Sequence, residues 1–175
     1  MGPVQSKRLA ACAFLSLAAP VLLGATSNDT SFFERVVAAH NRERAATGSP
    51  PLKWDEDLAR GARQWAAYLA RSGRFAHSPD EPGSMPIGEN IWGGTAARYQ
   101  PEAMVDLWVA EKRYFKPGTF PQNSTSGRVE DVSHYTQLIW RSSQHVGCGV
   151  SRGANEDILV CRYSEAGNIV GQRPV

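Results

Sequence analysis

Beyond residue 28, the sequence has no excess of charge of either sign. The whole chain of 175 residues contains 19 basic and 17 acidic residues, and Lys7 and Arg8 are the only charged residues before Asp29. Without those two, 17 residues of each sign remain. Nucleic-acid binding needs a concentrated basic surface that releases counterions, and this sequence gives no sign of one. We therefore expect no nucleic-acid partner.

Long apolar runs are scarce, and the longest lies at the N-terminus. Residues 9–23 are almost uninterruptedly apolar, follow the charges of Lys7 and Arg8, and precede small residues at 24–27. This order is typical of a signal peptide, and the run is shorter than the ~20 residues of a membrane span. We expect residues 1–25 to be a signal peptide and residues 26–175 to be one domain without a transmembrane segment. The protein is then secreted, either extracellular or, in a Gram-negative bacterium, periplasmic.

Cysteine is also scarce. Cys12 falls within the expected signal peptide, which leaves Cys148 and Cys161 in the mature chain. Disulfides persist outside the cytosol, so we expect these two cysteines to be bonded to each other. Closing a loop of this size stabilises a fold by about 3 kcal/mol in the chain-entropy model. Two unpaired thiols would suit the cytosol better, and a metal site of this kind would need a second cysteine pair.

Several catalytic motifs are missing as well. The sequence has no Gly-x-Ser-x-Gly, no His-Glu-x-x-His and no P-loop. These absences leave the nucleophile-elbow hydrolases, the helical zinc peptidases and the P-loop proteins without support. Asn28 and Asn123 begin glycosylation sequons, which matter only in a eukaryotic source.

The first half of the mature chain is predicted to be helical. Ser31 and Glu34 form a capping-box pattern before a helix that runs to about Thr47. Asp55 is a suitable N-cap for a second helix, which Gly73 ends.

A third helix is predicted to begin at Pro101, a residue that suits the first helical position. Its expected apolar stripe comprises Met104, Leu107, Trp108 and Phe115. Glu111 interrupts this stripe at a position where the helical period calls for a core residue. A carboxylate there is either buried with a partner or faces a cleft.

The second half of the chain is predicted to contain most of the strands. A short helix is expected over 133–140, with Ser133 as its cap, and strands are expected at 87–92, 146–152 and 158–163. The last two strands flank the turn residues 153–155, so they are predicted to form a hairpin that carries Cys148 and Cys161. Partly segregated helices and strands indicate an α+β or a layered αβα arrangement.

Six blocks of sequence resemble the CAP superfamily, which includes cysteine-rich secretory proteins, antigen 5 and plant pathogenesis-related proteins. The blocks are His40-Asn41 with Arg44-Ala45, Pro51–Asp55, Gly88–Ile91, Ser133–Trp140, Gly147–Gly149 with Cys161–Tyr163, and Gly167–Pro174. They span about Phe32 to Pro174, in the family's order. The resemblance implies an α+β fold, a three-layer αβα sandwich with a central antiparallel sheet, and supports the Cys148–Cys161 pairing. Arg162 departs from the pattern, because asparagine is common at its position.

The resemblance also implies a cleft lined by two histidines and two acids. Carried over by motif, these are His77 in Phe-Ala-His-Ser, Glu89 in Gly-Glu-Asn, Glu111 in Trp-Val-Ala-Glu, and His134 in His-Tyr-Thr-Gln. Two neutral imidazoles can bind a divalent metal with water in the other positions. We therefore expect His77 and His134 to be ligands of Zn²⁺ or another divalent cation. Glu89 and Glu111 would be polar residues of the same cleft, able to orient the imidazoles or to act as a base.

Three functions stay open. The first is a secreted binding protein that takes a divalent cation and a small ligand or lipid. The second is a metal-assisted hydrolase of peptides or cell-wall material, which is less favoured because no nucleophile is evident and catalytic zinc usually has three protein ligands. The third is a sterol- or lipid-binding defence protein in which the His/Glu network is structural. The sequence favours a protein without a catalytic residue and gives no oligomeric state.

The other two histidines have simpler interpretations. His40 lies on the apolar stripe of the first helix, so we expect a hydrogen-bonded core residue. His145 precedes a strand, and we expect it to be exposed.

Overall fold

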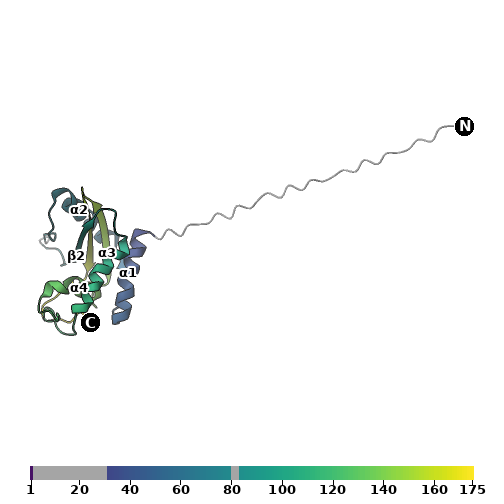
Figure 1. The fold of residues 1–175 in the computed structure, drawn as a ribbon. Helices are drawn as coiled ribbons and strands as arrows, with labels where there is room; N and C mark the ends of the chain where they lie inside the picture. Colours follow the sequence, from purple (N-terminus) through teal and green to yellow (C-terminus); the bar gives the residue numbers. More distant parts are fainter. Residues whose placement is uncertain (2–30, 80–82) are drawn as a thin grey trace.

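The computed structural model describes residues 31–79 and 83–175, together with Met1. Apart from Met1, the expected signal peptide, including Cys12, lies outside the described residues. The sequon at Asn28 also lies outside them. The elements in chain order are α1 (Phe32–Thr47), β1 (Lys53–Trp54), α2 (Glu56–Ser72), β2 (Gly88–Thr95), α3 (Pro101–Val109), η1 (Ala110–Tyr114), η2 (Val129–Asp131), α4 (Ser133–Ile139), β3 (His145–Arg152) and β4 (Glu156–Ser164) (Figure 1). Among the described residues, no helix is both long enough and apolar enough to cross a membrane.

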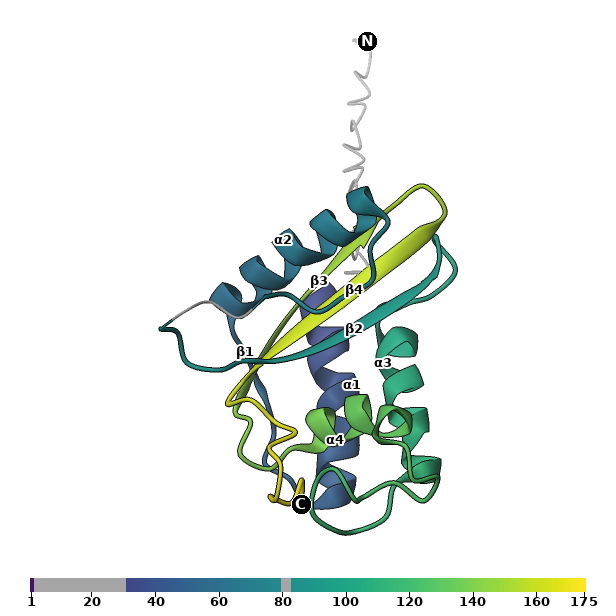
Figure 2. The same cartoon turned by 90° about the vertical axis from the view of Figure 1, so that its left-hand side faces the viewer.

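The elements form three layers around one sheet. The strand order is β1-β3-β4-β2, in which β3, β4 and β2 are antiparallel and the short β1 pairs parallel with β3. Helix α2 covers one face of the sheet, while α1, α3 and α4 lie on the other (Figure 2). This arrangement confirms the expected α+β fold and the αβα sandwich.

Two glycines on β3 allow α2 to pack directly against the sheet. A Cβ atom on Gly149 would lie 2.5 Å from the Cα atom of Arg63, and one on Gly147 would lie 2.1 Å from the backbone nitrogen of Ala59 on α2. Successive side chains of a strand point to opposite faces, so Cys148 points away from α2. It is bonded there to Cys161, the residue directly opposite on β4. The Gly-Cys-Gly block thus admits the helix on one face and joins two strands on the other.

The third helix differs from its prediction. Its α-helical part ends at Val109 and continues as the 3₁₀ turn η1, so Glu111 does not lie in an α-helix. Leu107 was expected in the core but is 46% exposed, whereas Val105 is fully buried. The buried stripe follows Met104, Val105 and Trp108, a spacing of i, i+1 and i+4 that places these side chains on one helical face.

His40 is a hydrogen-bonded core residue, as predicted. It is fully buried on α1, with Nδ1 2.8 Å from the carbonyl oxygen of Val36 and Nε2 2.8 Å from the hydroxyl of Tyr163. Burial lowers the pKa of His40 to about 4, so the ring is neutral at physiological pH. His145, which was expected to be exposed, is half-buried on β3.

Replacing Gly149 with alanine should destabilise the fold, because the added Cβ atom meets the backbone of α2 and the helix must move. We expect a loss of about 1–3 kcal/mol in the free energy of unfolding, measured by denaturant titration. Gly118→Ala is the matched control, because a Cβ atom there would be 3.9 Å from its nearest neighbours. Equal losses in the two variants would contradict the packing argument.

The buried His40 should make the fold sensitive to mild acid. The unfolded chain binds a proton at His40 below about pH 6.5, whereas the folded chain stays neutral there until about pH 4, so stability falls as the pH falls through this window. We expect this group to contribute about 3 kcal/mol to that loss. In His40→Gln the contribution is absent. Unfolding titrations of both proteins across the window test this, and parallel stability curves would refute it.

Candidate functional site

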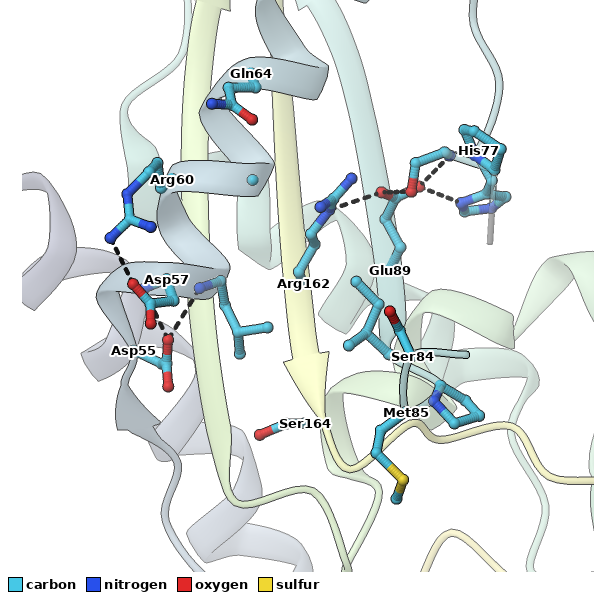
Figure 3. A pocket seen from close by; sticks show the side chains of 16 residues that line it. Asp55, Asp57, Arg60, Gln64, His77, Ser84, Met85, Glu89, Arg162 and Ser164 are labelled. Carbon is cyan, nitrogen blue, oxygen red and sulfur yellow. Dashed lines mark hydrogen bonds and ion pairs between the residues drawn. The ribbon is translucent and has the colours of Figure 1, made fainter. Parts of the chain in front are cut away.

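Glu89, near the start of β2, connects this strand with the segment that contains His77 and Ser78 and with β4. Its carboxylate accepts hydrogen bonds from His77 Nδ1 at 2.9 Å, from the backbone N–H and hydroxyl of Ser78 at 2.9 and 2.7 Å, and from Arg162 Nε at 3.3 Å (Figure 3). The Glu89 side chain is only 7% exposed, whereas the His77 side chain is 65% exposed. Glu89 therefore fixes the segment after α2 to the edge of the sheet and to β4.

These contacts determine the protonation states of Glu89 and His77, the first His–Glu pair. Burial alone would raise the pKa of Glu89, but the hydrogen bonds from His77 and Ser78 and the charge of Arg162 outweigh it, so the pKa is lowered. The hydrogen bond with Glu89 in turn raises the pKa of His77. Because Glu89 is a carboxylate at neutral pH, it must accept and His77 Nδ1 must carry the hydrogen. The lone pair of a neutral His77 is then on Nε2.

Glu111 and His134 form a second pair of the same kind. Glu111 Oε1 lies 2.7 Å from His134 Nδ1, and Oε2 accepts from the backbone N–H groups of His134 and Tyr135, both at 3.1 Å. These N–H groups belong to the first turn of α4, where a carboxylate is favourable. The His134 ring also stacks on Trp108, with ring centroids 6.1 Å apart. Glu111 interrupts the apolar stripe of its segment because it positions α4.

Neighbouring residues of β2 contact the two pairs: Glu89 belongs to the first, and Asn90 binds the backbone of the second. Asn90 follows Glu89, and its side-chain amide donates to the carbonyl oxygen of His134 at 3.0 Å. Adjacent side chains of a strand point to opposite faces, so Glu89 and Asn90 extend to different sides of β2. A pocket of about 880 Å³ beside α2 is lined by His77 and Glu89, whereas Glu111 and His134 are not among its lining residues. The structure thus groups the four predicted site residues as two pairs.

Both pairs leave one imidazole nitrogen free. Within the described residues, neither His77 Nε2 nor His134 Nε2 has a hydrogen-bond partner. A carboxylate on Nδ1 with Nε2 available is the arrangement that metal-binding histidines usually have. The described part of the chain contains no group of three or more His, Cys, Asp or Glu residues placed to hold a metal ion. Each pair therefore offers one imidazole nitrogen, and water would complete the coordination of a metal held by both histidines.

Three residues that contact the His–Glu pairs were not expected from the sequence to take part in the site: Ser78, Asn90 and Trp108. Each lies within, or beside, a block that was already singled out, since Ser78 follows His77 and Asn90 follows Glu89. Arg162 was noted as a departure from the family pattern, but its contact with Glu89 was not foreseen. For Ser78 and Asn90 the signal was present, because polar residues next to a site residue are the nearest candidates for its partners.

Comparisons with known proteins agree with this architecture. The CAP model, described as the Cysteine-rich secretory protein family, matches residues 37–163. A "Pathogenesis-related protein PR-1 type" of Sambucus nigra is 39% identical over 139 residues, which cover 79% of this chain and 78% of that protein. "Pathogenesis-related protein 1C" of Nicotiana tabacum is 34% identical over 137 residues, covering 78% and 76%.

Solved structures share the fold. A structure titled "Crystal structure of NaASP2 with Zn2+" superposes with a TM-score of 0.67 at 21% identity, covering 80% of this chain and 82% of that one. MpPR-1i superposes with a TM-score of 0.54 at 25% identity, covering 79% and 90%. Since the family match takes in both the sheet and the His–Glu pairs, this chain belongs to the CAP family of cysteine-rich secretory proteins.

Proposed function

We propose that this protein is a secreted binding protein that holds a divalent cation through Nε2 of His77 and of His134. The observation that carries the proposal is the repeated arrangement of the two pairs. In each, a glutamate takes the Nδ1 hydrogen and leaves Nε2 as an acceptor. A neutral imidazole oriented in this way is a good ligand for Zn²⁺ and similar cations.

Two further observations support the proposal. Glu89 and Glu111 each make at least three hydrogen bonds, so each can hold its histidine in one orientation without a bound metal. The NaASP2 structure was obtained with Zn²⁺, which makes this the first cation to test. Secretion rests on the signal-peptide pattern of residues 1–25 and on the Cys148–Cys161 disulfide, a bond typical of oxidising compartments.

The proposal extends to a second ligand. The pocket of about 880 Å³ has the volume of a small-molecule site and adjoins the His77–Glu89 pair. A small ligand or lipid bound there would contact one of the two pairs directly. In this proposal the protein binds its ligands without catalysing a reaction, so the quantity to measure is its affinity for them.

Calorimetric titration of the purified mature protein with Zn²⁺ tests the metal site. We expect binding that is abolished in His77→Ala and in His134→Ala and retained in His145→Ala, a control outside both pairs. Affinity should fall as the pH falls, because protonation removes the Nε2 lone pair, and the raised pKa of His77 moves this loss above the ~6.5 of an ordinary histidine. Binding that survives in either variant would contradict a site that uses both histidines.

The two glutamates should act by orienting the histidines. Glu111→Gln and Glu89→Gln keep the side-chain size but weaken the hold on Nδ1, so we expect Zn²⁺ affinity to fall by about 10–100-fold. The matched control is Glu56→Gln, because Glu56 is an exposed residue that bonds Arg63 and Trp54 away from both pairs. Thermal unfolding of each variant separates lost orientation from lost folding. Unchanged affinity in both site variants would remove the orienting role.

A further inference from the structure

The pocket beside α2 contains an arginine that uses few of its hydrogen-bond donors. Arg162 extends from β4, and its Nε donates to Glu89. Within the described residues, its Nη1 and Nη2 atoms make no hydrogen bond. The side chain is only 15% exposed, so these donors have less access to bulk water than those of a surface arginine. Neither Nη atom is among the described buried polar atoms that lack a partner, so both keep some contact with solvent and are available to an acceptor in the pocket.

The acidic residues of the pocket are already engaged with protein donors. Asp55 caps α2 by accepting from the N–H groups of Asp57 and Leu58. Asp57 forms an ion pair with Arg60. Glu89 accepts the four hydrogen bonds of its own cluster. Apart from the bond between Glu89 and Arg162 Nε, none of these acids accepts a hydrogen bond from Arg162.

The position of the guanidinium is set by a glycine. Arg162 lies against α2 at Gly61, where a Cβ atom would overlap Nη1. Figure 3 shows the guanidinium between α2 and the strand that carries Glu89, within the ring of residues that line the pocket. Any side chain at position 61 would push the guanidinium away from this place.

The other walls of the pocket suit an organic molecule rather than an inorganic ion. Leu58, Met85, Pro86 and Ile87 supply apolar surface, and Met85 is 76% exposed. Neutral hydrogen-bonding groups come from Gln64, Ser84 and Ser164. A cavity of about 880 Å³ with apolar walls and two arginines, of which Arg60 is paired with Asp57, has the character of a small-molecule site.

We propose that this pocket binds a small organic carboxylate. The two carboxylate oxygens accept from Nη1 and Nη2 of Arg162, the paired geometry that guanidinium groups favour. The body of the ligand lies along the apolar wall formed by Leu58, Met85 and Ile87. This inference rests on the small-ligand pocket of the proposed function and names the chemical class of its ligand, but it needs neither a metal nor His134. A free acid and the C-terminal carboxylate of a peptide offer the same chemistry.

Two pairs of probes test the proposal and separate these sources. N-acetyl-glycyl-phenylalanine is compared with its C-terminal amide, and 3-phenylpropionate with 3-phenylpropionamide, by calorimetry in the presence of a metal chelator. We expect at least one acid to bind about tenfold or more tightly than its amide, because only the acid makes charge-assisted bonds to Arg162. Preference for the acid in the peptide pair alone identifies a peptide terminus. No preference in either pair, or no binding at all, overturns the proposal.

Variants assign any preference to Arg162. Arg162→Gln should abolish the difference between acid and amide, and Gly61→Ala should reduce it by displacing the guanidinium while leaving the charge unchanged. Arg63→Gln is the control, because Arg63 lies on α2, as Gly61 does, but is not among the residues that line the pocket. Thermal unfolding checks each variant, and Gly61→Ala decides the matter if Arg162→Gln does not fold. A preference that survives both variants, or that Arg63→Gln removes equally, overturns the proposal. The chelator makes the result independent of the Zn²⁺ site.

Discussion

The buried guanidinium of Arg44 is the interaction on which the position of α4 depends. Arg44 is fully buried on α1 and donates to the carbonyl oxygens of Leu138, Trp140 and Ser143, and also to that of Pro50. None of the described carboxylates pairs with it, so its charge is balanced by carbonyl dipoles at and beyond the C-terminal end of α4. Burial lowers its pKa to about 10, which leaves it charged at neutral pH. Without this side chain, three carbonyl groups at and beyond the end of α4, and that of Pro50, would each lose a donor.

The same helix also supports the other end of α4. Glu43, the residue before Arg44 in the chain, accepts from the hydroxyl of Tyr135 at 3.0 Å and from Lys112 Nζ at 3.2 Å. These two residues directly follow His134 and Glu111, respectively. Helix α1 therefore holds both partners of the second His–Glu pair through their chain neighbours, while Glu111 binds the first turn of α4. The geometry of His134 follows from buried contacts that are independent of any ligand.

Local signals in the sequence predicted what local interactions decide. The caps at Ser31 and Asp55 and the stop at Gly73 gave the bounds of α1 and α2, because capping depends on residues close in the chain. Strand β1 was not predicted, since its two residues form a strand only by pairing with β3. The four site residues could be named from motifs, but the contact of Arg162 with Glu89 could not. These two residues are opposite each other in the β2–β4 register, which only the folded sheet establishes.

The charge balance around Glu89 connects the two proposed ligands. A buried carboxylate needs compensation, and Glu89 receives it from both His77 and Arg162. A carboxylate ligand on Arg162 would draw that charge away, and Glu89 would then bind the His77 ring more strongly. A more basic Nε2 is a better metal ligand, so the anion would favour the metal. Because coupling between two sites is reciprocal, the metal would favour the anion to the same extent. In this pocket, Glu89 is the residue through which either ligand would affect the other.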